Sequence, residues 1–390
     1  MTWCIIFALC VTRSNMIKII KSILFFVLLT VNAIAYAVTL DEKIGQMLII
    51  GFNGTQINSN SDITNTIKKY NIGGVILFDY NYNTKTFDKN IKNPSQVKTL
   101  NHTLQQVTHQ TNKDAQREDL PLIISVDFEG GQVNRLSEQH GFTRTYSPKA
   151  VAQMPLNKAK DVINEMAETL SENGFNLDFA PDVDVDINPN NPIIGKKERS
   201  FSSNPYVVAE YAQYYSDAFL NNKVQCAYKH FPGHGSSSAD SHLGFVDVTN
   251  SWSTKELAPY FKLLSQQKHC GMVMSAHIVN RMLDPSGMPA TLSHTVLTKI
   301  LRNQLHFEGV IITDDMQMKA ISEHYGLEQA LVLAINAGAD MFIFGNQLVE
   351  TPQDTGELVS IIHEKVNSGE IPRSRIDEAY ERIKAFKQGL

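Results

Sequence analysis

The sequence predicts an α/β protein built as a single (β/α)8 barrel of the TIM type. Eight apolar runs of strand length alternate with helical patterns along the chain. The runs are nearly continuous and end at Gly, Pro, Asn or Asp, which is typical of strands buried on both faces of a parallel sheet. Helices between such strands imply parallel crossovers. An open doubly wound sheet is the alternative, but eight strands favour closure, and a barrel of about 250 residues leaves room for long loops.

The predicted elements follow each other in a regular order. The strands are expected at Met47–Phe52, Gly74–Phe78, Leu122–Val126, Leu177–Pro181, Val224–Tyr228, Met272–Ala276, Val310–Thr313 and Met341–Phe344. The helices are expected at Ser95–His109, Lys158–Asn173, Tyr206–Asn221, Ser253–Gln266, Ser293–Leu305, Leu327–Ala337, Leu358–Val366 and Arg375–Lys387. Neither an internal repeat nor a linker rich in Pro or Ser interrupts this order, so residues 38–390 are expected to form one catalytic barrel domain.

The first 37 residues have the pattern of a secretory signal peptide. Arg13, Lys18 and Lys21 precede or flank the apolar run 23–31, and Ala35-Tyr-Ala37 has the small-x-small form of a cleavage site. We expect cleavage after Ala37 and an exported protein, periplasmic or secreted, without a stable membrane anchor. An uncleaved anchor is the alternative interpretation of the same segment.

Composition excludes several classes of partner. Removal of the leader takes three positive charges from the chain, so the formal net charge changes from −5 to −8. An acidic body without a basic tract argues against nucleic acids and anionic membrane surfaces. The hydrophobic content of 43% is that of an ordinary globular core.

Two cysteines, Cys226 and Cys270, remain beyond the leader. An exported chain permits one bridge between them. Because each lies in or beside a predicted buried strand, we expect two packed thiols instead.

Polar side chains follow several of the predicted strands. Strand three leads into Asp127, strand five into Lys229-His230, strand six into His277, and strand seven into Asp314-Asp315. A single acid at a strand end can be a helix N-cap. Four such ends are better explained by convergence, because the carboxyl ends of barrel strands share the face that carries the active site.

A loop rich in glycine and serine follows strand five and carries a candidate acid/base. It contains K-H-F-P-G-H-G at 229–235 and D-S-H at 240–242. Asp240 can accept a hydrogen bond from His242 and stabilise its protonated form, which makes His242 a candidate general acid and base. Asp314 follows a rigid strand, as a nucleophile requires. The pair predicts glycoside hydrolysis with retention of configuration.

Two other chemistries use the same region. His230, His234, Asp240 and His242 are ligand types that zinc accepts, but Pro232 and the glycines prevent a regular helical face, so the sequence indicates no metal geometry. A Cys226 nucleophile is disfavoured because no base lies beside it in the sequence.

The same segments resemble a known family. K-H-F-P-G-H-G with the downstream D-S-H resembles the signature of family 3 glycoside hydrolases, in the β-N-acetylglucosaminidase branch. Residues 40–47 resemble the start of the family's barrel domain, 126–131 (V-D-F-E-G-G) its sugar-binding turn, and 312–316 (I-T-D-D-M) its nucleophile segment. The resemblance covers most of the chain beyond the leader. The segment 194–201 is longer by two residues than the family pattern.

The resemblance implies roles for individual residues. Asp314 would form the glycosyl-enzyme intermediate, and His242 would be the acid/base with Asp240 as its partner. The hydroxyl groups of the N-acetylglucosamine ring would be held by Asp127, Arg135, Arg199, Lys229 and His230. The partner would be a small saccharide from peptidoglycan or chitin, and the reaction would need no metal or other cofactor.

The reaction type and the orientation of the two adjacent aspartates stay open at this level. Transfer to phosphate instead of water, a β-glucosidase-type activity and an exported sugar-binding protein without turnover are alternatives to the hydrolase. Asp314 and Asp315 would point to opposite faces if the strand stays extended. Asp315 would then have a capping or supporting role.

Overall fold

The structure is a computed structural model that describes residues 38–347 and 349–390, so the predicted leader lies outside the described residues. Within them, eight strands form a closed barrel. They are β1 (Leu48–Gly51), β2 (Gly74–Ile76), β3 (Ile123–Val126), β6 (Leu177–Asp178), β7 (Gln225–Phe231), β8 (Met272–Ser275), β9 (Val310–Asp315) and β10 (Met341–Phe344).

Neighbouring barrel strands are parallel, and their order around the barrel is their order along the chain. The ring closes because β1 pairs with β2 on one side and with β10 on the other. Each predicted strand overlaps an observed one. The predicted fold class, a single (β/α)8 barrel, is therefore confirmed.

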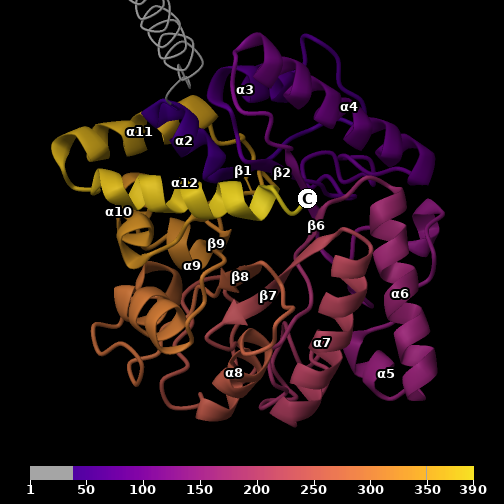
Figure 1. Cartoon of the computed structure of the whole chain (residues 1–390). Coiled ribbons are helices and arrows are strands. Elements are labelled where there is room, and N and C mark those ends of the chain that lie inside the picture. The colour runs from indigo at the N-terminus through magenta and orange to yellow at the C-terminus, as the bar shows by residue number, and fades with distance from the viewer. Residues whose placement is uncertain (1–37, 348) are drawn as a thin grey trace, which may run out of the picture. The chain divides into compact units, whose positions relative to one another are not determined.

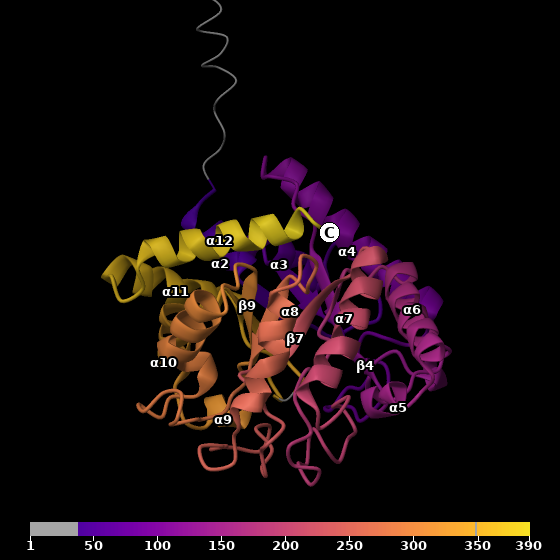
Figure 2. The same cartoon turned by 60° about the horizontal axis from the view of Figure 1, so that its bottom comes forward.

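Helices surround the barrel strands (Figures 1 and 2). They are α2 (Leu40–Gln46), α3 (Asp62–Tyr70), α4 (Pro94–Asp114), α5 (Pro148–Ala152), α6 (Leu156–Glu172), α7 (Pro205–Asn221), α8 (Ala258–Leu264), α9 (Lys319–Ser322), α10 (Leu327–Ala337), α11 (Thr355–Ser368) and α12 (Arg373–Lys387). Short 3₁₀ turns lie at Glu138–His140, Thr254–Leu257 and Ala290–Leu292, and a π-helix spans Thr295–Gln304. In Figure 1, α2 and α12 lie side by side, so segments from the two ends of the described chain meet.

The sequence missed α3, the helix between the first two strands. Its buried positions are Ile63, Thr64 and Ile67, and the rest of its nine residues are more exposed. Such a narrow apolar stripe gives a weak helical signal. The predicted helix at 293–305 exists, but it is wound as a π-helix rather than an α-helix.

The prediction of two free thiols is wrong, because Cys226 and Cys270 form a disulfide. Cys226 belongs to β7, and Cys270 lies just before β8, its neighbour in the barrel. Their Cα atoms are 4.8 Å apart, within the range of disulfides. Their sequence separation of 44 hid this proximity. The order of the strands in the barrel creates it.

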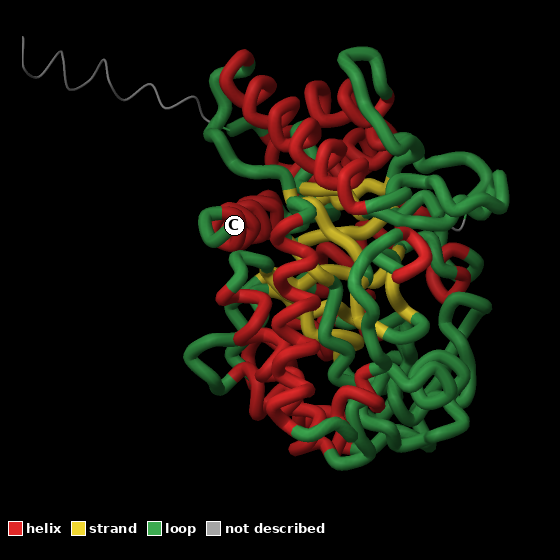
Figure 3. Tube along the Cα trace, turned by 90° about the vertical axis from the view of Figure 1, so that its right-hand side faces the viewer, coloured by secondary structure: helices red, strands yellow, loops and turns green. Residues whose placement is uncertain are grey.

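Long connections gather on one side of the strands (Figure 3). The first part of the connection after β3 is a short antiparallel hairpin of β4 (Phe128–Gly130) and β5 (Val133–Asn134). Gly130 has φ +91°, and a Cβ there would lie 2.3 Å from the carbonyl oxygen of Tyr146. The turn therefore requires glycine, and it places Glu129 inside the protein.

In residues 38–347 and 349–390, none of the helices is both long and apolar enough to span a membrane.

Candidate active site

A pocket of about 200 Å³ lies where the predicted polar strand ends converge. Of the predicted site residues, all except Asp240 line it: Asp127, Arg135, Arg199, Lys229, His230, His242 and Asp314. These residues come from the ends of β3, β7 and β9 and from the loops that follow β3, β6 and β7. The barrel thus brings together side chains that are up to 187 residues apart between Asp127 and Asp314.

Asp314 and Asp315 both line the pocket. The condition for opposite faces, an extended strand, is not met because β9 is irregular there. Its pairing with β10 shifts register between Met341 and Ile343, so the end of β9 departs from an extended strand. Asp315 also accepts a hydrogen bond from the backbone N–H of Gln317 at 3.0 Å, as a local cap would.

The two aspartates differ in charge. Burial opposes ionisation of Asp314, but three nearby imidazoles, of which His277 acts most strongly, hold its pKa below the ordinary value. Burial and then the neighbouring Asp314 charge raise the pKa of Asp315 to about 7. Asp314 is therefore the carboxylate, which suits a nucleophile, and Asp315 is largely protonated below neutral pH.

His277, predicted only as a polar strand end, is almost completely buried beside these aspartates. Its Nε2 donates to the carbonyl oxygen of Asp315 at 3.0 Å, and its Nδ1 contacts the Thr291 hydroxyl at 2.8 Å. It lies close enough to affect the charge of Asp314 without lining the pocket itself.

His242 and Asp240 form the predicted pair. Nδ1 of His242 lies 2.8 Å from Oδ1 of Asp240, and the same oxygen accepts the backbone N–H of His242 at 2.9 Å. Hydrogen bonding to His242 holds the pKa of Asp240 below its usual range despite partial burial. With Nδ1 occupied by a carboxylate, Nε2 is the ring atom left to exchange a proton with a ligand.

The floor of the pocket is a buried charge network. Arg199 donates to both carboxylate oxygens of Glu129 at 2.7 Å. Lys229 contacts Glu129 at 2.6 Å and Asp127 at 2.9 Å. Burial alone would raise the pKa of Glu129, but Arg199 and Lys229 outweigh it, so Glu129 stays ionised. The network orients donors and acceptors toward the pocket before a ligand arrives.

His230 joins this floor to a second pair of acids. Its Nδ1 lies 2.7 Å from Asp184, and its Nε2 lies 3.1 Å from Arg199. Asp182 contacts Nε of Arg199 at 3.4 Å. Burial raises the pKa of Asp182, whereas His230, against the cost of burial, helps lower the pKa of Asp184 to about 2.

Three side chains of this cluster are of types that can ligate a metal ion. Ligand atoms of Asp182, Asp184 and His230 lie within 4.8 Å of one another. His230 already bonds Asp184, and Arg199 supplies positive charge beside Asp182. This set shares only His230 with the four zinc ligands that the sequence suggested. Two of those four, Asp240 and His242, pair with each other. Within the buried set of three, His230 and Asp184 bond each other, whereas Oδ2 of Asp182 accepts no hydrogen bond from the described residues and has the Arg199 guanidinium as its charge partner.

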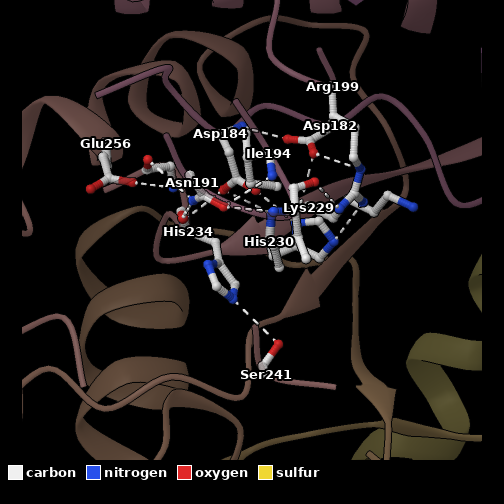
Figure 4. A network of polar contacts seen from close by, with 12 residues as sticks. Asp182, Asp184, Asn191, Ile194, Arg199, Lys229, His230, His234, Ser241 and Glu256 are labelled. Carbon is white, nitrogen blue, oxygen red and sulfur yellow. Dashed lines mark hydrogen bonds and ion pairs between the residues drawn. The ribbon is translucent and has the colours of Figure 1, made fainter. Parts of the chain in front are cut away.

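The residues that lead from β7 into the loop with Asp240 and His242 are held by several polar contacts (Figure 4). Buried Glu256 accepts the backbone N–H groups of Gly235 and Ser236 at 2.7 and 3.3 Å. His234 donates its backbone N–H to Asp184 at 2.7 Å, and its Nε2 lies 3.3 Å from the hydroxyl of Ser241. Ser241 lies between Asp240 and His242 in the chain, so His234 links the floor to the Asp240–His242 pair.

Sequence reasoning assigned no role to Glu129, Asp182, Asp184 or Glu256, and it considered His234 only as a possible zinc ligand. The strand-end rule could have found Asp182 and Asp184, because they follow the fourth predicted strand. Glu129 lies in the quoted V-D-F-E-G-G segment, yet its partners are 70 and 100 residues away. Glu256 carried no local signal, since an acid beside a helix start is most often a surface residue.

Comparison with known proteins assigns this site to a family. The model of the glycosyl hydrolase family 3 N-terminal domain matches residues 39–386. The chain belongs to glycoside hydrolase family 3. This confirms the resemblance inferred from residues 229–242, and the relatives place the chain in the β-N-acetylhexosaminidase branch.

Three relatives illustrate the match. A β-hexosaminidase A from Pseudoalteromonas piscicida is 34% identical over 296 residues, which are 72% of this chain and 47% of that protein. A β-hexosaminidase from Tolumonas auensis is 34% identical over 282 residues, 70% of this chain and 76% of that protein. The structure of a family 3 β-N-acetylglucosaminidase from a Paenibacillus species has a TM-score of 0.79 and 32% identity, and the match covers 90% of this chain and 63% of that one. This chain therefore spans about half the length of the first relative.

Proposed function

We propose that this protein is an exported, retaining β-N-acetylglucosaminidase. Its substrates would be saccharides derived from peptidoglycan or chitin, from which it removes terminal, non-reducing β-linked N-acetylglucosamine. The observation that carries the proposal is one pocket lined by the Asp314 carboxylate and by an imidazole, His242, whose other nitrogen is paired with Asp240. Retaining glycoside cleavage requires a carboxylate nucleophile and a separate acid/base.

The reaction would proceed in two steps. An oxygen of Asp314 attacks the anomeric carbon, the glycosidic C–O bond breaks, and protonated His242 gives its proton to the departing oxygen. Neutral His242 then takes a proton from water, whose oxygen attacks the same carbon and releases Asp314. Asp240 stabilises the imidazolium between turnovers.

The buried floor would hold the sugar. Arg199 and Lys229 donate hydrogen bonds only, and Asp127 accepts only, while a sugar ring offers both kinds of partner. Because Glu129 fixes the two cations, their side chains need not be ordered when the ring binds. His230 is fixed through its Nδ1 by Asp184, and its Nε2 lies beside Arg199 in the same pocket.

Export is supported by two independent features. The leader pattern of residues 1–37 predicts secretion. The Cys226–Cys270 disulfide fits an oxidising compartment, because such bonds are rare in proteins of the cytosol.

The decisive experiment measures the products from an aryl β-N-acetylglucosaminide and from the matching β-glucoside, in buffer with and without phosphate. We expect free N-acetylglucosamine from the first substrate, slow or no release from the second, and unchanged rates in excess EDTA. Release of the sugar 1-phosphate would show phosphorolysis. Equal release from both substrates would remove the N-acetyl specificity, and no release from either would favour a sugar-binding protein.

A further inference from the structure

The loop between β2 and α4 carries a cluster of aromatic side chains at the edge of the pocket. Tyr82 and Phe87 expose 58% and 56% of their surface, respectively. Tyr80 and Tyr82 line the same pocket as Asp314 and His242. Large exposed apolar groups are a cost in water unless they contact a ligand or partner, so rings beside a pocket mark a binding surface.

The rings hold one another in place. Tyr80 meets Tyr82 edge-to-face at 4.9 Å between ring centres, and it meets Phe87 at the same distance with a tilt of 59°. Phe87 in turn contacts the ring of His140 at 5.7 Å. Edge-to-face pairs stabilise a fixed arrangement, so the exposed face of Tyr82 does not depend on a single free side chain.

The backbone under the rings is also fixed. Asn81 and Thr86 form an antiparallel bridge, and the N–H of Asn81 donates to the carbonyl of Thr86 at 2.8 Å. Gln347, which follows β10, donates to the carbonyl of Tyr80, and Lys89 donates to Gln347 at 2.7 Å. A preformed surface of this kind loses little conformational entropy when it binds a ligand.

The size of the pocket decides what these rings contact. Its volume of about 200 Å³ is below the range of about 300–1,000 Å³ typical of sites that enclose drug-sized ligands. The charged floor and the Asp314 and His242 side chains line this pocket, whose volume would hold one sugar ring. A second ring of an oligosaccharide must therefore lie at the rim, and Tyr82 is the one strongly exposed large apolar side chain, among the described residues, that lines the pocket.

We propose that Tyr82, braced by Tyr80 and Phe87, is the platform for the second pyranose ring of a β-linked saccharide, which is the leaving group of the reaction. The C–H groups on one face of a β-linked pyranose pack against the face of the phenol ring. The inference rests on the proposed hydrolysis and adds a preference for a sugar, rather than a small alcohol, as the leaving group. It requires no charge on that second ring.

The test compares two substrates with leaving groups of the same chemical type. N,N′-diacetylchitobiose and methyl β-N-acetylglucosaminide both release an alcohol that needs protonation, but only chitobiose has a second ring. The ratio of their kcat/KM values is the readout. We expect Tyr82→Ala to lower this ratio about tenfold or more, Phe87→Ala to lower it less, and Tyr82→Trp to preserve it because a ring face remains.

Tyr206→Ala is the matched control, because Tyr206 exposes 71% of its surface and does not line the pocket. Its ratio should equal that of the wild type. The proposal is overturned if Tyr82→Ala lowers kcat/KM equally for both substrates or leaves the ratio unchanged. If the wild type cleaves neither substrate, the proposed function itself fails, which is a separate outcome from a wild type that cleaves both with a ratio insensitive to Tyr82.

Discussion

At the floor of the pocket, the side chains of Glu129, Arg199 and Lys229 are at most 7% exposed, whereas His242 on the neighbouring loop keeps 46% of its side chain exposed. The floor charges are each paired with at least one opposite charge from a distant part of the chain. The loop pair is made within three consecutive residues, and it reaches the floor through Ser241 and His234.

This difference matches the two tasks that the proposed function assigns to the site. Fixed buried charges can orient a sugar and stabilise charge that develops in the transition state, because they need no reorganisation. An acid/base must instead change its protonation state in each cycle, which a partly exposed imidazole does at low cost. The comparison predicts that floor and loop variants fail in different ways.

The largest loss is expected from Asp314→Asn, at the end of β9. Removal of the nucleophile should reduce kcat on the order of 10⁴-fold or more. Asp315→Asn should retain a measurable fraction, because burial already raises the pKa of Asp315 to about 7 and a neutral amide resembles its protonated form. The check is steady-state kinetics of both variants, with a mechanism-based fluorosugar as label. Labelling of Asp315 instead of Asp314 would overturn the assignment.

His242→Ala tests the loop and should cost about 10²–10⁴-fold on unactivated substrates. With an activated aryl leaving group the first step needs little acid, so the intermediate should accumulate and give a burst. Azide needs no base, and it should restore turnover and yield the β-glycosyl azide. His102→Ala, an exposed histidine of α4, serves as control. Wild-type turnover of the aryl glycoside by His242→Ala would refute the acid/base role.

Glu129→Gln tests whether the floor acts by orienting the sugar and not by transferring a proton. It leaves Arg199 and Lys229 with one buried partner fewer, and breaking such a pair costs about 3–5 kcal/mol of stability. We expect a lower free energy of unfolding in urea together with reduced kcat/KM, and no rescue by azide. Glu138→Gln, at an exposed position of the 3₁₀ turn after β5, should change neither quantity. Rescue of Glu129→Gln by azide would contradict the prediction that floor and loop variants fail in different ways.

Ser241→Ala removes the contact between the loop and His234. A hydrogen bond of this kind contributes about 0.5–1.5 kcal/mol, so kcat should fall by at most about tenfold while the fold is retained. Ser238→Ala, an exposed position of the same loop, is the matched control. The measurement is kcat on chitobiose, since an unactivated leaving group depends fully on the placement of His242. Equal effects of the two variants would mean that His234 does not position the loop.

Glu256→Gln should change the pH dependence of stability with the smallest effect on turnover. Burial raises the pKa of Glu256 to about 7, above its ordinary value of 4.5. The folded state thus binds an extra proton between these values, and the stability contributed by Glu256 falls as pH rises from about 4.5 to about 7. Relative to wild type, Glu256→Gln should gain stability at pH 8 compared with pH 5 in urea unfolding. A pH-independent difference would contradict this.

Several features followed from local sequence alone. The eight apolar runs predicted the strands because a strand buried on both faces has almost no polar residues. The pairing of Asp240 with His242 was predictable because two residues of separation fix the contact. The gathering of Asp127, Lys229 and Asp314 at one mouth followed from the strand ends, since parallel strands in a barrel share one carboxyl face.

Tertiary structure decided the rest. Glu129 became a buried anion only because Lys229 arrives from β7 and Arg199 from the connection after β6. Cys226 met Cys270 only because β7 and β8 are neighbours. The irregular end of β9 placed Asp315 in the pocket beside Asp314 and raised its pKa. Burial and the charges of distant neighbours set these properties, and neither quantity is encoded by the residues next to each position in the chain.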